Sequence, residues 1–240
     1  MIKKLKNCIL KNKVITEKAK FTDVFKNIYL KKKSPVSLIH FLTNRCNARC
    51  SFCFIDFDNP NSFKNELTLS EIDQMTKNLG NTLLNVNFTG GEPFARKDII
   101  DIAKLYIKNT TIQSLYITTN ASLPVRIIEF AKIIHEYDKK VELNFQISID
   151  DLPGNHDKVR KIENLFNDCI LTYRELKNLN KEKIKPSVSI TVSHENCENI
   201  EKIFYYLVDE KKIYSLKCCI VRDEGVYTTP KDKIAKILKA

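Results

Sequence analysis

The sequence predicts an α/β protein whose parallel sheet is covered by helices, and three observations lead to this class. From Ser37 onward, short apolar or β-branched runs alternate with longer segments in which apolar residues follow the helical period. Each strand and its following helix occupy roughly 30 to 45 residues, as a βαβ progression requires. Six such units can be counted. Six strands form either an open doubly wound sheet or an incomplete barrel, and the handedness of the connections does not choose between them.

The segment before the first unit is basic and has helical periodicity. Its apolar residues are Ile2, Leu5 and Ile9, followed by Phe21, Val24, Phe25 and Ile28. We expect one or two amphipathic helices in this N-terminal extension, residues 1–34. One role for them is docking on an anionic membrane surface or on a partner, and the other is a lysine-clad cover for the bottom of the sheet. We expect the second role, because such helices commonly pack on one side and face solvent on the other.

The remaining elements follow in order through a single core domain, residues 35–240. The predicted strands are apolar or β-branched and span residues 38–43, 84–89, 114–119, 141–149, 187–193 and 216–221. The helices between them are periodic, and Thr68 and Glu71 form a capping-box pattern at the start of the first one. A short helical stretch from Pro230 to Lys239 closes the chain.

Length and composition narrow the class of protein further. A chain of 240 residues with 43% hydrophobic residues is long enough for one sizeable domain and short for two. No apolar run approaches the roughly 18 residues of a membrane span, and lysines interrupt the N-terminus before a secretory signal could form. We therefore expect a cytoplasmic protein, in which clustered thiols among the eight cysteines more often bind metal than form disulfides.

The net charge of +11 raises the question of nucleic-acid binding, and its distribution argues against that function. Residues 1–33 carry eleven lysines against two acidic residues, so the rest of the chain has a surplus of only two positive charges. Seven of the forty basic residues are arginine, the residue best suited to bidentate phosphate contacts, and stacking aromatics do not interleave with any basic stretch. We expect no nucleic-acid partner.

Three cysteines follow the first predicted strand in a C-x3-C-x2-C loop, as Cys46, Cys50 and Cys53. A closed structural zinc site takes four ligands, and a ferredoxin-type cluster takes a fourth thiolate, but no fourth cysteine is near in sequence. Soft thiolates select zinc or iron-sulfur clusters. A cubane cluster held by three of them leaves one iron open for chemistry.

This loop resembles the cluster loop of the radical S-adenosylmethionine (SAM) superfamily, including the aromatic residue Phe52 before the last cysteine. The resemblance implies a [4Fe-4S] cluster on the three cysteines and SAM bound to its open iron. Reductive cleavage of SAM would then yield a 5'-deoxyadenosyl radical that abstracts hydrogen from a substrate, and a flavodoxin or ferredoxin would supply the electron. The sequence does not specify the substrate, which we expect to be a peptide, a cofactor precursor or a small metabolite.

Later strand ends carry further matching motifs. Gly90, Gly91, Glu92 and Pro93 resemble the GGEP motif of the superfamily, whose backbone and carboxylate contact the amino group of SAM. Thr118-Thr-Asn120-Ala resembles a Thr-Asn-Gly sequence, which implies a cofactor contact for Asn120. Ser148-Ile-Asp150 and the following Arg160 resemble a Ser-x-Asp-Gly and His-Asp-x-x-Arg pair, with Asp151 in place of the glycine. Alternatively, Asp150 caps the next segment and pairs with Arg160.

Every matching motif lies at the C-terminal end of a predicted strand, where αβ barrels place their sites. This placement selects the barrel, and the resemblance implies the partial (β/α)6 TIM-like barrel of the superfamily over residues 37–222. After Arg222 there is no cysteine-rich SPASM-type extension. We therefore expect a partner protein, a dimer or a further segment to cover the barrel mouth. The other cysteines are interpreted as buried structural thiols.

Two other functions remain open. The chain could be a non-catalytic iron-sulfur or zinc-binding protein in which the GGEP-like turn is structural. It could also be an inactive partner subunit that keeps the cluster.

Overall fold

The computed structural model describes residues 21–31, 34–222 and 237. Within them the elements follow in the order α3 (Phe21–Lys26), η1 (Asn27–Lys31), β1 (Ser37–Thr43), η2 (Pro60–Phe63), α4 (Leu69–Asn78), β2 (Asn85–Gly90), η3 (Pro93–Ala95), α5 (Ile99–Asn109), β3 (Ser114–Thr119), α6 (Pro124–Tyr137), β4 (Glu142–Ser148), α7 (Asn155–Arg160), α8 (Leu165–Asn178), β5 (Ile184–Val192), η4 (Cys197–Asn199), α9 (Ile200–Tyr205), η5 (Tyr206–Glu210) and β6 (Leu216–Ile220). The predicted α/β class is confirmed. The expected helix over Pro230–Lys239 lies outside the described residues except at Ile237.

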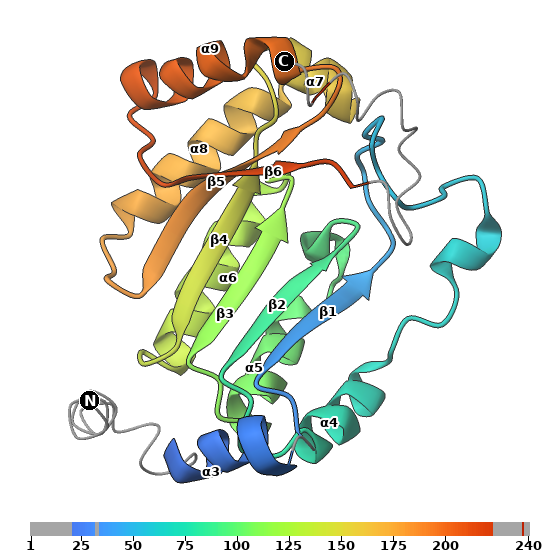
Figure 1. The fold of residues 1–240 in the computed structure, drawn as a ribbon, viewed down its shortest axis with the longest axis vertical. Coiled ribbons are helices and arrows are strands. Elements are labelled where there is room, and N and C mark those ends of the chain that lie inside the picture. The colour runs from blue at the N-terminus through green and yellow to red at the C-terminus, as the bar shows by residue number, and fades with distance from the viewer. Residues whose placement is uncertain (1–20, 32–33, 223–236, 238–240) are drawn as a thin grey trace.

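The six strands form one parallel sheet in the order β1-β2-β3-β4-β5-β6. A doubly wound sheet would reverse its strand order at a switch point, so this unbroken order belongs to a barrel that has not closed. The sheet is strongly curled. As a result, the Lys217 ammonium on β6 lies only 5.9 Å from the ring centre of Tyr116 on β3. Figure 1 shows the helices on the outer side of the sheet and β6 crossing over the strands before it.

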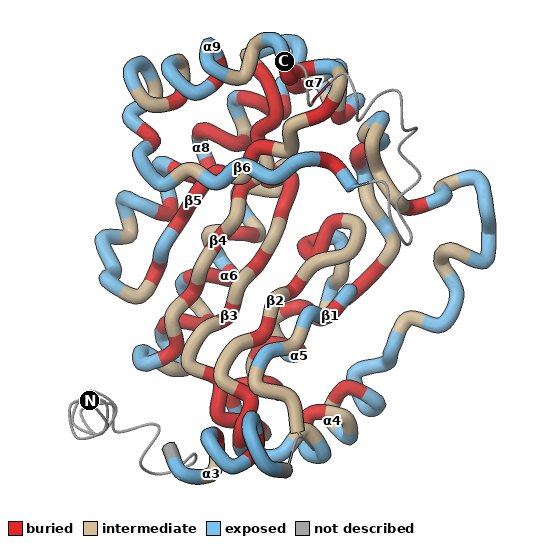
Figure 2. Tube along the Cα trace, in the orientation of Figure 1, coloured by how far each residue is buried: buried red, intermediate tan, exposed pale blue. Residues whose placement is uncertain are grey.

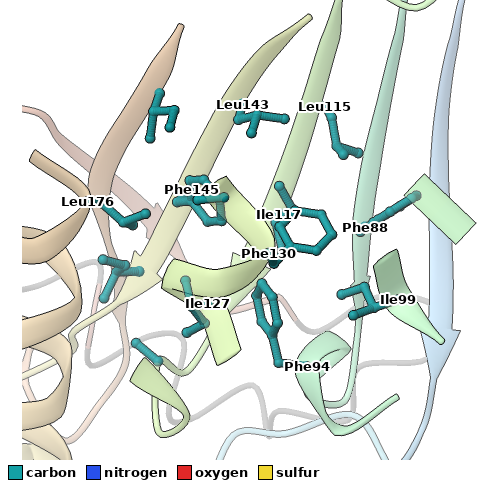
Figure 3. Packing of buried hydrophobic residues seen from close by; sticks show 14 of the residues in the cluster. Phe88, Phe94, Ile99, Leu115, Ile117, Ile127, Phe130, Leu143, Phe145 and Leu176 are labelled. Atoms are coloured by element: carbon teal, nitrogen blue, oxygen red, sulfur yellow. The ribbon is translucent and has the colours of Figure 1, made fainter. Parts of the chain in front are cut away.

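The core lies between the sheet and its outer helices. Residues from alternate strand positions, such as Leu115, Ile117 and Phe145, are fully buried against Phe94 and Phe130 (Figure 3). The Phe130 ring makes edge contacts with both Phe94 and Phe145, at centroid distances of 5.4 and 6.2 Å. Because side chains alternate across a strand, the residues between these point to the concave face of the sheet. The hydrophobic core therefore lies between the sheet and its outer helices, and the side chains on the concave face of the sheet are not part of it.

The structure confirms the capping box and explains one shifted strand boundary. The Thr68 and Glu71 side chains each accept the backbone N–H of the other residue at the start of α4. Strand β5 begins at Ile184, three residues earlier than predicted, and includes Pro186. Proline argues against a central strand, since it cannot donate to a neighbour. It is tolerated here because β6 pairs with β5 only from Val188 onward.

The N-terminal helical segment, α3 and η1, differs from the prediction in the face that it presents. Val24 and Asn27 are buried, whereas Phe25 and Ile28, which were expected to pack on the barrel, are about half exposed. The Asn27 amide hydrogen-bonds to Thr82 and Ser34, and this contact turns the apolar residues outward. The rest of the proposed extension lies outside the described residues, so its division from the core stays a prediction. None of the helices in the described part of the chain is long and apolar enough to cross a membrane.

Candidate cofactor pocket

One pocket of about 290 Å³ lies at the C-terminal ends of the strands. It is lined by residues from the ends of β2 to β6, from the loop after β1 and from α7: Cys46, Ala48, Cys50, Phe52, Cys53, Phe54, Thr89, Gly90, Gly91, Thr118, Thr119, Asn120, Ser148, Arg160, Thr191, Cys219, Ile220, Val221 and Arg222. The three predicted cluster ligands therefore share one pocket with most of the predicted cofactor contacts. A groove of larger volume between α6 and α8 contains none of these residues.

The three thiols belong to a loop that is tied to distant parts of the fold. The Arg49 N–H donates to the carbonyl of Arg160 at 3.0 Å, and a turn closes between the Cys53 N–H and the Cys50 carbonyl. In the part of the chain that the structure describes, no three His, Cys, Asp or Glu side chains converge as the ligands of a single ion would. The thiols surround a space instead. This arrangement suits a cluster in which each thiolate binds a different iron.

Burial sets the protonation of two of these thiols. It raises the pKa of Cys46 to about 11, although the Ala48 N–H hydrogen bond to Sγ opposes the shift. Burial also raises the pKa of Cys50, against the nearby positive charge of Arg160. Both groups are neutral thiols at pH 7, and a metal would have to displace their protons.

Gly90 and Gly91 allow the backbone at the end of β2 to contact the backbone of the loop after β1. A Cβ atom on Gly90 would lie 2.3 Å from the carbonyl oxygen of Thr43, and one on Gly91 would lie 2.2 Å from that of Arg45. The same approach forms two hydrogen bonds, from the Gly91 N–H to Thr43 at 2.7 Å and from the Glu92 N–H to Arg45 at 2.9 Å. Glycine at both positions thus lets the end of β2 dock on the loop that carries the cysteines.

Glu92 and Pro93 lie behind the pocket wall. The Glu92 side chain is 1% exposed, and its carboxylate accepts from the Asn120 N–H at 2.7 Å, the Thr119 hydroxyl at 2.8 Å and the Phe94 N–H at 3.0 Å. Burial raises the pKa of this carboxyl, while the three hydrogen bonds favour its charged form. Pro93 begins the 3-10 turn η3, consistent with its expected place at a helix start. Within the described residues, Glu92 holds the ends of β2 and β3 together.

Asn120 joins the third strand end to the cluster loop. Its Nδ2 donates to the Asn47 side chain at 2.9 Å and lies 3.8 Å from the Cys46 sulfur. The next residue, Ala121, has φ of 59°, the left-handed conformation for which the glycine of the resembling motif is suited. Asn120 therefore ties the end of β3 to the loop that carries Cys46.

Asp150 and Arg160 form a buried ion pair below the pocket. The Arg160 Nε and one terminal nitrogen each lie 2.7 Å from the same Asp150 oxygen, and the other oxygen accepts the Thr191 N–H at 3.0 Å. The pairing considered for these two residues is therefore observed. Arg160 and Ser148 line the pocket, whereas Asp150 does not. Asp151, in place of the motif's glycine, adopts no left-handed backbone.

The buried His156 supports this ion pair from behind. Its Nδ1 accepts the Asp150 N–H at 3.1 Å, and its Nε2 lies 3.8 Å from the Cys169 sulfur. Burial lowers the pKa of His156 to about 3, so the imidazole is neutral.

Sequence reasoning named no site residue on the last two strands. Thr191 of β5 and Cys219 of β6 line the pocket, as do Val221 and Arg222. Cys218 and Cys219 were expected to be buried, but both are exposed because β6 is an edge strand. The parallel register offered a signal, since Thr191 and Cys219 are paired at the same sheet edge as the other site residues. Cys169 and Cys197 are buried as predicted, and Cys8 lies outside the described residues.

Phe52 also makes a packing contact that the motif alone did not predict. It packs with Val192, Cys197, Val221 and Ile237 in a small hydrophobic cluster that is separate from the main core. This cluster joins the cysteine loop, which follows the first strand, to the ends of the last two strands.

The arrangement agrees with what comparison to known proteins finds. Residues 41–207 match the sequence profile of the radical SAM superfamily. The chain belongs to this superfamily. The Fe-coproporphyrin III synthase of Methanosarcina barkeri is 31% identical over 188 residues, which cover 76% of this chain and 43% of the relative. A GTP 3',8-cyclase of Haemophilus influenzae is 28% identical over 171 residues, with coverage of 70% and 48%. The chain thus spans less than half the length of these two curated relatives.

Solved radical SAM structures share the fold. The structure of anSMEcpe with bound AdoMet has a TM-score of 0.62 at 19% identity, covering 85% of this chain and 56% of that one. Methylornithine synthase (PylB) has a TM-score of 0.60 at 14% identity, with coverage of 90% and 65%. These likenesses confirm the partial barrel. Enzymes of the superfamily use a [4Fe-4S] cluster and SAM.

Proposed function

We propose that this chain is a radical SAM enzyme that holds a [4Fe-4S] cluster through Cys46, Cys50 and Cys53 and binds SAM in the same pocket. The observation that carries the proposal is the convergence of three thiols, the glycine pair and four further strand ends on one cavity. When bound, the cluster and SAM would supply one-electron cleavage of the sulfonium and a radical that abstracts hydrogen from a substrate. The donor set fits, because three soft thiolates leave the fourth position of a cubane for a further ligand.

The protein's own residues have distinct parts in this proposal. Gly90 and Gly91 present backbone to the cavity, and Ser148 offers a hydroxyl, so these groups would orient the polar end of SAM. The positive charge of Arg160, fixed by Asp150, would face the carboxylate of SAM or the sulfur of Cys50. Glu92 would attract the amino group of SAM from behind the wall and keep the ends of β2 and β3 in place.

The concave face below the pocket supports a polar substrate. Closed αβ barrels fill this space with branched apolar side chains. Here most of the corresponding positions on β2 to β5 carry amides and hydroxyls in register, namely Asn85, Asn87, Ser114, Tyr116, Thr118, Asn144, Gln146, Ser187 and Ser189. Such a surface binds through hydrogen bonds. Strand β1 adds the exposed apolar residues Ile39 and Phe41 to this face. We propose a substrate rich in hydrogen-bonding groups, and a small protein donor such as a flavodoxin or ferredoxin as the source of electrons.

The test is formation of 5'-deoxyadenosine. The full chain is reconstituted anaerobically with iron and sulfide, supplied with SAM and dithionite, and compared with the variant Cys46→Ala/Cys50→Ala/Cys53→Ala. We expect about four irons per chain and deoxyadenosine from the native protein alone. Cys218→Ala is the matched control, because it removes an exposed thiol that does not line the pocket.

Two outcomes would overturn the proposal. A native protein that binds a cluster but neither binds nor cleaves SAM would be a non-catalytic iron-sulfur protein or an inactive subunit. A protein that takes up one zinc per chain and no iron would be a zinc protein.

A further inference from the structure

The helical segment made of α3 and η1 presents an apolar face to solvent. Ile28, Tyr29 and Leu30 are 43%, 64% and 73% exposed. Phe25, one turn before Tyr29, is 48% exposed and its ring centre lies 4.7 Å from that of Tyr29, so exposed apolar side chains adjoin one another on this segment. Contiguous exposed patches of this kind mark interaction surfaces. In Figure 2 the tube of this segment is coloured mostly as exposed, and it lies at the end of the molecule where the strands begin.

The orientation of this face is fixed by the body of the protein. Asn27 Oδ1 accepts the Ser34 N–H at 3.0 Å, and Asn27 Nδ2 donates to the Thr82 hydroxyl at 3.2 Å and to the Ser34 carbonyl. Val24, one turn earlier, is buried on the same side. The helix therefore cannot roll its apolar residues inward without leaving the Asn27 amide unpaired.

The sequence that contains this segment is basic. Residues 1–33 carry nine of the eleven surplus positive charges of the chain. The end of α5 and the turns that lead into β4 and β5 lie on the side of the sheet where the parallel strands begin, as this segment does, and they add the lysines Lys108, Lys139, Lys140, Lys181 and Lys183. Their acidic neighbours are Glu136, Asp138, Glu142 and Glu182; Glu136 forms an exposed ion pair with Lys139, and Glu142 pairs with Lys185. Lysines at helix C-termini also stabilise the helices, but that effect does not explain an apolar face among them.

We propose that Ile28, Tyr29 and Leu30 insert into an anionic lipid surface, with the surrounding lysines bound to the headgroups. A helix with exposed aromatic and aliphatic residues flanked by lysine fits the interface of a bilayer, and charge complementarity favours anionic lipid over an acidic groove on a protein. The segment lies at the end of the sheet opposite the cofactor pocket (Figure 1). Docking would leave the pocket facing away from the membrane and open.

Vesicle cosedimentation of the full, reconstituted chain tests this inference. The vesicles contain 30% phosphatidylglycerol in phosphatidylcholine, or phosphatidylcholine alone. We expect the partition coefficient to be at least tenfold higher on the anionic vesicles and to fall at least tenfold between 0.05 and 0.5 M salt. The variant Ile28→Ser/Tyr29→Ser/Leu30→Ser should lose at least tenfold in binding, because three exposed apolar groups no longer enter the interface.

A matched control separates this face from apolar exposure in general. Val125→Ser/Leu171→Ser/Tyr214→Ser replaces side chains that are 81%, 48% and 73% exposed elsewhere on the surface, and it should bind as the native protein does. Equal binding to both kinds of vesicle at low salt would overturn the proposal, as would native binding by the Ile28 triple variant. A native dimer that this variant abolishes, without any vesicle binding, would instead assign the face to a second copy of the chain.

Discussion

Replacing Gly91 with alanine should damage the site through backbone overlap alone. Its φ is not in the left-handed region, but a Cβ atom would lie 2.2 Å from the Arg45 carbonyl oxygen and 2.9 Å from the Asn44 carbonyl carbon. Restoring a contact of 3.4 Å requires the β2 end and the cysteine loop to separate by about 1.2 Å. The 2.9 Å hydrogen bond from the Glu92 N–H to Arg45 would then break. Overpacking and the lost bond together cost about 2 to 4 kcal/mol of unfolding free energy.

Anaerobic urea denaturation of the metal-free protein measures this cost, and iron content after reconstitution measures the effect on the loop. Gly154→Ala is the control, because that position has φ of 80° with nothing within 4 Å of the added Cβ. It carries only the local backbone strain of an L-residue at φ of 80° and ψ of −44°, about 1 to 3 kcal/mol, and should keep its iron. If Gly91→Ala is no less stable than Gly154→Ala and binds native amounts of iron, the close approach of β2 to the loop is not what requires glycine.

Two other perturbations follow from buried charges. Asp150→Asn leaves the Arg160 guanidinium buried without its counter-ion and should lower the unfolding free energy, measured by urea denaturation, by about 3 to 5 kcal/mol. The control Glu136→Gln, at an exposed ion pair, should lower it by less than about 0.5 kcal/mol. Similar losses for both variants would refute the burial argument. Burial lowers the pKa of His40 from 6.5 to about 4, so between these values the unfolded chain binds more protons and stability falls as the pH is lowered, by roughly 3 kcal/mol in all. His40→Gln should lower the slope of the unfolding free energy against pH by about 1.4 kcal/mol per pH unit over this window, while the contribution of the buried His156 remains. An unchanged slope would contradict the assignment.

The sequence was sufficient for the strands and the cysteine loop, because periodicity and spacing are local properties. The run at Ser114–Thr119 was predicted to the residue. Tertiary contacts decided what could not be predicted. Glu92 lies behind the cavity wall because the end of β3 supplies hydrogen-bond donors to its carboxylate. Cys219 is exposed because β6 is the last strand of the sheet. The outward face of α3 depends on an amide contact over 55 residues of chain, which no local pattern encodes.

The unclosed barrel has a seam between its first and last strands, and the cofactor pocket lies across it. In the described chain no backbone hydrogen bonds pair β1 with β6. The cysteine loop after β1 and residues 219–222 nevertheless line the same cavity, and Phe52 packs in one cluster with Val221. A cluster and SAM bound there would fasten the two margins of the sheet to each other. Loss of iron, for example on exposure to oxygen, would then loosen both ends of the fold together. Hydrogen-exchange protection of β1 and of β6 should therefore increase together as the cofactors are loaded and decrease together as they are lost.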